Sequence, residues 1–145
     1  MLHPRIFARM ALAAAIGLTA TTALSSDASP IGVWTTPEDG GQVRILACGA
    51  NLCGRVVTSK QLKADPTLKD ARNKDPALRG RPLKDLQLMS GFSGGPKVWK
   101  NGRIYRPQDG GTYSGRMELV DANRLKVTGC VAPGLCQTQT WTRVR

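Results

Sequence analysis

The sequence predicts an all-β protein, a single antiparallel up-and-down β-barrel of eight or nine strands with one long loop at about 60–83. Short runs with β-branched residues or alternating apolar residues recur roughly every ten residues, as in sheet proteins built from short strands. Turn sequences rich in Gly, Asn, Asp and Pro separate these runs, and helical periodicity is almost absent. Sequential hairpins close into a barrel because closure leaves no strand edge exposed. A two-sheet sandwich is the alternative.

The N-terminus has the pattern of an export signal. Arg5 and Arg9 precede an apolar run rich in Ala and Leu, and small residues allow cleavage after Ala23 or Ala28. The run is shorter than the roughly 20 residues that a spanning helix needs, so we expect cleavage rather than a retained membrane anchor.

We therefore expect residues 1–28 to be a cleaved signal peptide and residues 29–145 to form one β-barrel domain. The mature chain is then a periplasmic or secreted protein and not an integral membrane protein. A chain of this length is long enough for one hydrophobic core.

The first half of the domain has three strand-like runs in a meander and then a long irregular segment. The predicted strands are Ile31–Thr36, Gln42–Ala47 and Gly54–Ser59. In the segment that follows, three X-Pro pairs exclude a long helix because the residue before each Pro is disfavoured in helix. One helical turn around Pro66–Asp70, capped by Asp65, is compatible with the sequence. Scattered Leu residues predict that this loop packs onto the barrel.

Strand signals resume at Leu83–Phe92 and continue to the C-terminus. In the segment 97–106, Asn101-Gly102 lies between two β-like runs, and such a pair is a strong signal for a hairpin turn. The remaining predicted strands are Thr112–Val120, Arg124–Gly129 and Gln137–Arg143.

The four cysteines predict two local disulfides, Cys48–Cys53 and Cys130–Cys136. Each pair flanks a turn-forming segment between two β-like runs, and exported chains with an even number of Cys usually pair them. A zinc site is the competing interpretation, but four and five intervening residues fit the usual ligand spacing poorly. Disulfides clipping two hairpins are therefore the expectation.

The only histidine, His3, lies in the predicted signal peptide. The mature chain then has no Ser-His or Cys-His pair, no imidazole base and no His-ligated metal. The carboxylates fall mostly in predicted turns, where Asp is expected for structural reasons. We expect no enzyme activity, no metal and no cofactor.

Positive charge is concentrated in the middle of the chain, whose formal net charge is +11 overall. Residues 60–106 hold twelve Lys or Arg against four Asp, a net +8. Such a field attracts anionic lipid, glycan or nucleic acid. Export makes nucleic acid an unlikely partner, and a solubilising surface without a specific partner explains the charge equally well.

Two short patterns resemble the lipocalin-like barrels. The first predicted strand carries Gly32-Val33-Trp34, and the last carries Trp141-Thr142-Arg143. In lipocalins such a Trp closes the narrow end of the barrel and an Arg from the last strand lies across it. The resemblance thus implies a structural role in barrel closure for Gly32, Trp34 and Arg143.

A more specific resemblance covers nearly the whole mature chain and is to the short exported bacterial proteins of the domain of unknown function 2147. It implies a lipocalin-like barrel in a Gram-negative periplasm and no established activity. Gly80 and Arg106 depart from the family pattern, which prefers Ser and Asp at these positions. The resemblance rests on Gly32–Trp34, Cys48–Arg55, Asp75–Leu83, Gly102–Tyr105 and Leu125–Arg143.

We therefore expect a non-enzymatic binding protein that carries a small, partly apolar or anionic ligand in the barrel mouth, where the long loop supplies Arg79 and Arg81. The alternative is a basic surface module around Trp99, Arg103 and Tyr105 that binds acidic envelope lipid or glycan. Each of these residues also has a structural interpretation: the Arg residues can bond loop carbonyls or carboxylates, and Trp99 can lie in the core. The sequence does not define the oligomeric state or the ligand.

Overall fold

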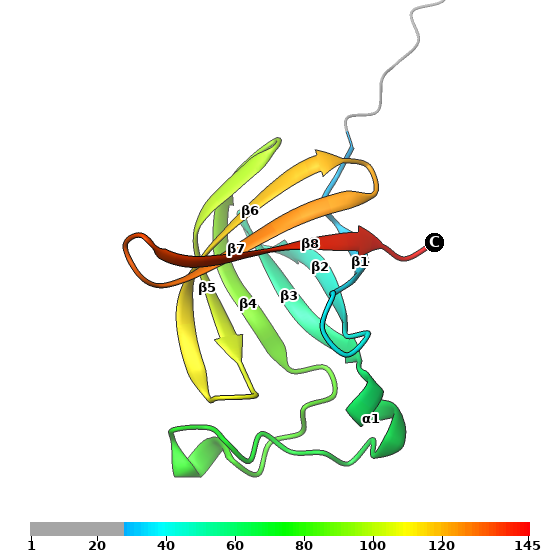
Figure 1. The fold of residues 1–145 in the computed structure, drawn as a ribbon, viewed down its shortest axis with the longest axis vertical. Helices are drawn as coiled ribbons and strands as arrows, with labels where there is room; N and C mark the ends of the chain where they lie inside the picture. Colours follow the sequence, from blue (N-terminus) through cyan, green and yellow to red (C-terminus); the bar gives the residue numbers. More distant parts are fainter. Residues whose placement is uncertain (1–27) are drawn as a thin grey trace, which may run out of the picture.

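A computed structural model describes residues 28–145, which form a closed antiparallel barrel of eight strands, each paired with the next in sequence (Figure 1). This confirms the predicted all-β up-and-down barrel and excludes the sandwich. The predicted signal peptide lies, apart from Ala28, outside the described residues. No helix within residues 28–145 is long and apolar enough to cross a membrane.

The elements follow one another in the order of the sheet, so every connection but one is a short turn. The exception joins β3 to β4 and contains the two helical segments. The bounds are β1 (Gly32–Thr35), β2 (Gln42–Cys48), β3 (Asn51–Thr58), α1 (Lys60–Ala64), η1 (Pro76–Leu78), β4 (Gln87–Gly94), β5 (Val98–Arg106), β6 (Gly111–Asp121), β7 (Arg124–Ala132) and β8 (Leu135–Arg143).

The inward-facing side chains fill the barrel. Alternate residues of a strand point to opposite faces, and the inner set here is apolar and nearly free of solvent exposure. Three indoles, one phenyl ring and two thioethers occupy most of this space, so the interior is a packed core. The core residues are Trp34, Val43, Ile45, Met89, Phe92, Trp99, Met117, Leu119, Leu125, Val127 and Trp141.

One end of the barrel is closed by Arg143. Its guanidinium lies over the Trp34 ring, 4.2 Å from the ring centroid, as a cation–π contact. The same guanidinium donates hydrogen bonds to the backbone carbonyls of Ser29, Ile31 and Ala122. Arg143 therefore joins the N-terminal segment, β1 and the β6–β7 turn at this closed end.

The opposite end carries the β1–β2 turn, the β5–β6 turn and the long β3–β4 connection, which lie together in Figure 1. We call this end the mouth of the barrel.

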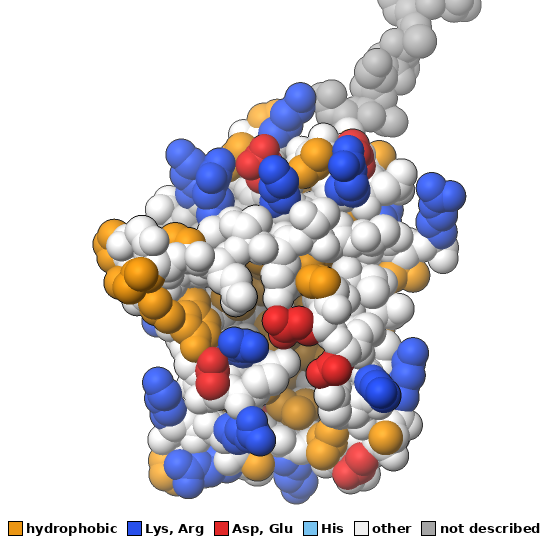
Figure 2. All heavy atoms as spheres, in the orientation of Figure 1, with side chains coloured by type: hydrophobic (Ala, Val, Ile, Leu, Met, Phe, Trp, Pro, Cys, Tyr) orange, Lys and Arg blue, Asp and Glu red, His pale blue; other side chains and the backbone are white. Residues whose placement is uncertain are grey.

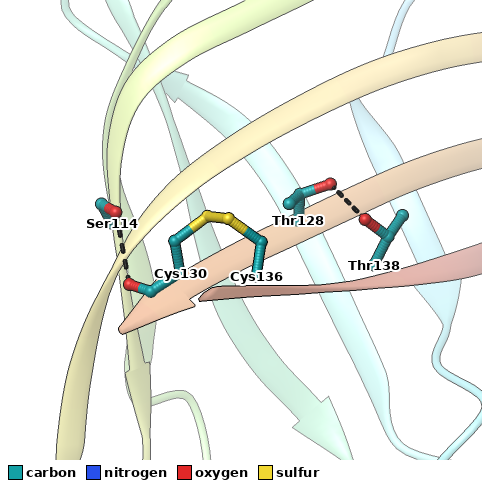
Figure 3. Close-up of a disulfide and its surroundings, with 5 residues drawn as sticks. All are labelled: Ser114, Thr128, Cys130, Cys136 and Thr138. Carbon is teal, nitrogen blue, oxygen red and sulfur yellow. Dashed lines mark hydrogen bonds between the residues drawn. A yellow bond between two sulfur atoms is a disulfide. The ribbon is translucent and has the colours of Figure 1, made fainter. Parts of the chain in front are cut away.

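Both disulfides are present, as predicted from the cysteine spacing. Cys130 and Cys136 are direct cross-strand partners, so their bond clips the β7–β8 hairpin on the outer face of the barrel (Figure 3). Beside it, the Thr128 and Thr138 hydroxyls share a hydrogen bond of 2.8 Å across the same two strands.

The prediction of a helical turn at Pro66–Asp70 is wrong. The helix lies earlier, at α1, because the Ser59 hydroxyl accepts a hydrogen bond from the Leu62 N–H and caps it. The carboxylate of Asp65, the predicted cap, accepts from the Thr67 N–H and hydroxyl instead, forming a local turn.

The prediction of a hairpin turn at Asn101-Gly102 is also wrong, because β5 continues through both residues. Asn101 does have the positive φ that an Asn-Gly turn needs, but a turn of that type requires positive φ at both residues. Gly102 instead pairs with Gly115 in the ladder, and the register shifts between Trp99 and Gly102. The β4–β5 turn lies at 94–97, where Gly94 and Gly95 have positive φ.

Candidate functional site

The long β3–β4 connection folds around one buried carboxylate, Asp70. Asp70 accepts hydrogen bonds from the Tyr105 hydroxyl at 2.6 Å, the Asn73 amide at 2.8 Å and the Arg81 guanidinium at 2.8 Å. Arg81 also lies over the Tyr105 ring at 5.2 Å, while Arg79 donates to the Asn73 carbonyl. Three residues were expected to bind a ligand: Arg79, Arg81 and Tyr105. Each instead donates a hydrogen bond to a polar group of the loop itself.

The electrostatics of this cluster favour an ionised Asp70. Burial by itself disfavours the charged carboxylate, but hydrogen bonds from Tyr105, Asn73 and Arg81 and the charge of Arg81 outweigh it, so the pKa of Asp70 is lowered. Burial and the neighbouring carboxylate raise the pKa of Tyr105, which therefore keeps its proton and donates a hydrogen bond to Asp70. The cluster is a satisfied ion pair that ties the loop to β5.

The same loop is held against the β5–β6 turn. The Arg72 guanidinium donates to the Gln108 carbonyl at 2.7 Å. Gly110 packs so closely on the Arg72 carbonyl that a side chain at this position would overlap it. These contacts fix the loop beside the barrel mouth.

The other two expected ligand residues lie on opposite faces of β5. Trp99 is buried in the core. Arg103 is exposed on the outer face, where it pairs in the ladder with Ser90 and Ser114. The structure therefore does not bring all five expected residues into one site.

A second polar cluster spans the mouth itself. Glu38, in the β1–β2 turn, lies 3.7 Å from the Arg106 guanidinium at the end of β5. Glu38 also accepts a hydrogen bond of 3.0 Å from the Gln139 amide of β8, and the Gln139 carbonyl accepts one of 2.9 Å from the Trp141 indole N–H. Side chains from the β1–β2 turn, the end of β5 and the middle of β8 thus converge beside a core tryptophan.

Asp109 and Tyr113 extend this cluster along β6. The Tyr113 hydroxyl donates to Asp109 at 2.6 Å, and the Gly111 N–H donates at 2.7 Å. Burial disfavours the charged form of Asp109, yet these two hydrogen bonds and the charges of Arg106 and Lys74 lower its pKa. Asp109 is therefore an anion beside Arg106, with 3.7 Å between the closest nitrogen and oxygen.

Arg106 lies in two long ion pairs at the mouth, with Glu38 and with Asp109. Its two carboxylate neighbours lie beyond normal hydrogen-bond distance, and its guanidinium makes no hydrogen bond within the described part of the chain. It is partly exposed, with 44% of its side-chain surface accessible. A planar guanidinium with free donors can bind a carboxylate or phosphate in bidentate geometry.

Sequence reasoning missed the mouth cluster. The available signal was strand parity: Arg106 shares the inward face with Ile104, and Gln139 shares it with Trp141. Parity shows which side chains face inward, but not which of them meet. That depends on the barrel register and on the path of the β1–β2 turn.

The surface also has an open depression of about 210 Å³ on the outer face of β6, β7 and β8. Figure 2, in the orientation of Figure 1, shows acidic and basic side chains interleaved across the middle of this view and hydrophobic side chains gathered over the β7–β8 hairpin. The depression is lined by Arg116, Met117, Glu118, Lys126, Thr128 and Thr138.

An eight-stranded up-and-down barrel with a Trp–Arg stack at its closed end has the lipocalin-like fold. A solved structure with the same fold is protein HP1028 of Helicobacter pylori, described as belonging to the lipocalin family. It is 23% identical, with a TM-score of 0.72, and the match covers 79% of this chain and 82% of that one. At this identity the likeness shows the fold alone.

The chain belongs to a family described as uncharacterized protein conserved in bacteria (DUF2147), whose model matches residues 32–143. This confirms the resemblance inferred from the sequence. No curated protein matches the chain.

Proposed function

We propose that the protein is an exported, non-enzymatic binding protein that holds a small anionic, partly apolar ligand at the barrel mouth. The observation that carries the proposal is the partly exposed guanidinium of Arg106, whose N–H groups make no hydrogen bond within residues 28–145 although two carboxylates lie 3.7 Å away. The ligand's anionic group pairs with Arg106, and its apolar part lies against Tyr113 and the exposed edge of the core. The two disulfides support function outside the reducing cytoplasm, in the periplasm.

The packed interior limits what such a site can hold. The three core tryptophans and Phe92 fill the space that a deep carrier would keep for its cargo. Barrels of eight strands are wide enough for either a packed core or one small ligand. A ligand bound at the mouth and covered by the β3–β4 loop is therefore the form of carrier that this barrel supports.

The first test is to purify the mature protein from its native compartment, denature it and identify any released small molecule by mass spectrometry. One recurring anionic species supports the proposal and supplies the probe for a binding assay. Arg106→Gln should then weaken binding of that species roughly ten- to a hundredfold, as expected for loss of a charge-assisted hydrogen bond.

Arg103→Gln is the matched control. Arg103 lies three residues earlier on the same strand and is exposed on the outer face, so it changes the net charge equally but leaves the mouth intact. If R103Q weakens binding as much as R106Q, the mouth is not the site.

The second candidate is a basic surface that binds acidic envelope lipid or glycan. The observation that favours it is the charge of residues 29–145, which hold 19 Lys or Arg against nine Asp or Glu. Such binding should fall steeply with salt concentration because exposed charges are screened. Binding to anionic vesicles that R103Q reduces and R106Q leaves unchanged would favour this candidate.

A further inference from the structure

Strand β8 has one open edge. It pairs with β7 along almost its whole length, but with β1 only through Thr142 and Arg143. β1 is four residues long and turns away at Thr36 towards β2, so it leaves the remainder of β8 uncovered. Within the described residues, segment 135–141 has no strand on this side.

The direction of two terminal hydrogen bonds shows which backbone groups face the gap. The Arg143 N–H donates to the Asn123 carbonyl on the β7 side, and the Val144 N–H donates to the Val33 carbonyl on the β1 side. Directions alternate along an antiparallel strand, so the N–H and C=O groups of Cys136, Thr138 and Thr140 point to the open side. All three residues are exposed.

This edge lacks the features that usually prevent strand pairing. Natural edge strands carry Lys, Pro or inward charges, or are very short. Segment 135–141 reads Leu-Cys-Gln-Thr-Gln-Thr-Trp and contains no charge and no proline. The adjoining tip of the β7–β8 hairpin exposes two apolar side chains, with Val131 68% and Leu135 65% accessible, and Figure 2 shows this hydrophobic surface on the hairpin.

We propose that β8 is a docking edge for a second copy of this chain, paired antiparallel with β8 of its partner about a two-fold axis at Thr138. In this register Thr138 lies opposite its own copy, Gln137 opposite Gln139, and Leu135 opposite Trp141. Residues directly opposite share a face, so the exposed Thr138 hydroxyls of the two copies meet, and the Gln137 amide of each copy meets the Gln139 amide of the other.

The length of the gap fits a second copy of β8. The uncovered segment begins where the β7–β8 turn ends and stops where β1 begins to pair, so Thr138 is its midpoint. An antiparallel copy centred on that residue therefore fills the whole gap without displacing β1. A lipid surface would cover the apolar turn but would not satisfy the backbone groups of the edge.

Two contacts order the β7–β8 hairpin before the copies associate. The Cys130–Cys136 bond and the Thr128–Thr138 hydrogen bond both tie β8 to β7 beside the open edge (Figure 3). Ordering the edge before association lowers the entropy cost of binding. One short strand pair is a small interface, so we expect a dimer that dissociates on dilution.

Sedimentation velocity of the mature chain across a wide concentration range should show a reversible monomer–dimer equilibrium. Thr138→Glu places like charges opposite each other at the two-fold axis and should shift the equilibrium at least tenfold towards monomer. Thr112→Glu is the matched control: it changes the same residue type at an exposed position of β6, which does not pair with β8, and should leave the dimer intact.

The net charge strengthens this comparison. Both substitutions reduce the positive charge of the chain equally, so general repulsion between copies falls in both. Loss of the dimer in T138E alone can therefore only come from the edge.

A cross-link provides a positive test. Directly opposed, hydrogen-bonded residues of antiparallel strands have Cα atoms about 5.5 Å apart, a distance that a disulfide spans. Thr138→Cys should therefore form a covalent dimer on oxidation, whereas Thr128→Cys should not. A wild-type chain that stays monomeric at all concentrations, a dimer that T138E leaves unchanged, or a monomer that sediments with phosphatidylglycerol vesicles through its hairpin would each overturn the proposal.

This inference does not rest on the proposed ligand site, and the two are tested separately. R106Q should weaken ligand binding without changing the monomer–dimer equilibrium, because Arg106 lies on β5 and not on the open edge. T138E should do the reverse.

Discussion

At the scale of single residues, Asp70 determines how the long loop lies on the barrel. Its buried carboxylate accepts hydrogen bonds from two loop residues, Asn73 and Arg81, and from Tyr105 of β5. Asp70→Asn keeps the shape of the side chain but removes the charge on which these donors depend. We expect a loss of about 2 kcal/mol in the free energy of unfolding, measured by urea denaturation near neutral pH.

Asp75→Asn is the control for this substitution. Asp75 caps η1 from an exposed position by accepting from the Ala77 N–H. Asn caps helices about as well as Asp, so this variant should unfold at nearly the wild-type urea concentration. Equal losses in D70N and D75N would show that the buried cluster has no special role.

The lowered pKa of Asp70 also predicts how stability depends on pH. Because the folded state holds this proton less tightly than the unfolded state, the ion pair contributes fully above the ordinary pKa of 3.8. That contribution is lost as the pH falls below 3.8 through the lower pKa of the folded state. Unfolding measured from pH 6 down to pH 2 should therefore show a smaller acid loss for D70N than for the wild type.

The partner of Arg81 illustrates what residue-scale sequence reasoning lacks. From the sequence, the loop arginines could bind a ligand anion, a loop carbonyl or a carboxylate such as Asp75 or Asp85. The structure pairs Arg81 with Asp70, eleven residues away. The choice depends on how the loop doubles back through the Lys69–Pro82 bridge, and no periodicity in the sequence encodes that path.

At the scale of elements, β5 explains why the Asn-Gly signal failed. Gly102 lies against the Phe92 ring, where any side chain would overlap the ring. Packing in the core, and not a turn, therefore explains the glycine at this position. Gly102→Ala should overpack this contact and destabilise the fold by about 1–3 kcal/mol, measured as a lower midpoint of thermal or urea unfolding.

Gly80→Ala separates packing from the general effect of replacing glycine. Gly80 has no atoms within 4 Å of the position a Cβ would take, and its φ is not positive. This variant should be neutral or slightly more stable than the wild type. If G102A is as stable as G80A, the close packing on Phe92 does not constrain β5.

The strands themselves were largely predictable because each is short, rich in β-branched or alternating apolar residues and bounded by turn residues. The differences lie at the ends: β7 and β8 extend to Ala132 and Leu135, beyond the predicted Gly129 and Gln137. Pairing across the clipped hairpin extends both strands, and cross-strand pairing is not visible in a local window of sequence.

At the scale of the whole molecule, closure of the barrel creates the features that local patterns could not predict. Glu38 and Gln139 meet although they are 101 residues apart in sequence. The Gly-x-Trp motif and the C-terminal Arg indicated closure, but not which side chains would gather at the opposite end. The mouth cluster is therefore a consequence of topology and register together.

Closure also rests on few contacts, which makes Arg143 a critical residue. Only two residue pairs join β1 to β8 within the described chain, and Arg143 supplements them with the Trp34 contact and hydrogen bonds to three carbonyls. Arg143→Met keeps the length and apolar stem of the side chain but removes all of these polar contacts. We expect a loss of about 2–4 kcal/mol in unfolding free energy.

Arg124→Met is the matched control because Arg124 forms an exposed ion pair with Asp121, in the same β6–β7 turn region that Arg143 reaches. Exposed pairs contribute at most about 1 kcal/mol, so R124M should remain near wild-type stability in the same urea titration. Hydrogen exchange locates the effect: R143M should lose protection first in β1 and at residues 142–143 of β8. Uniform loss over the whole barrel would instead mean that Arg143 stabilises the core without being specific to closure.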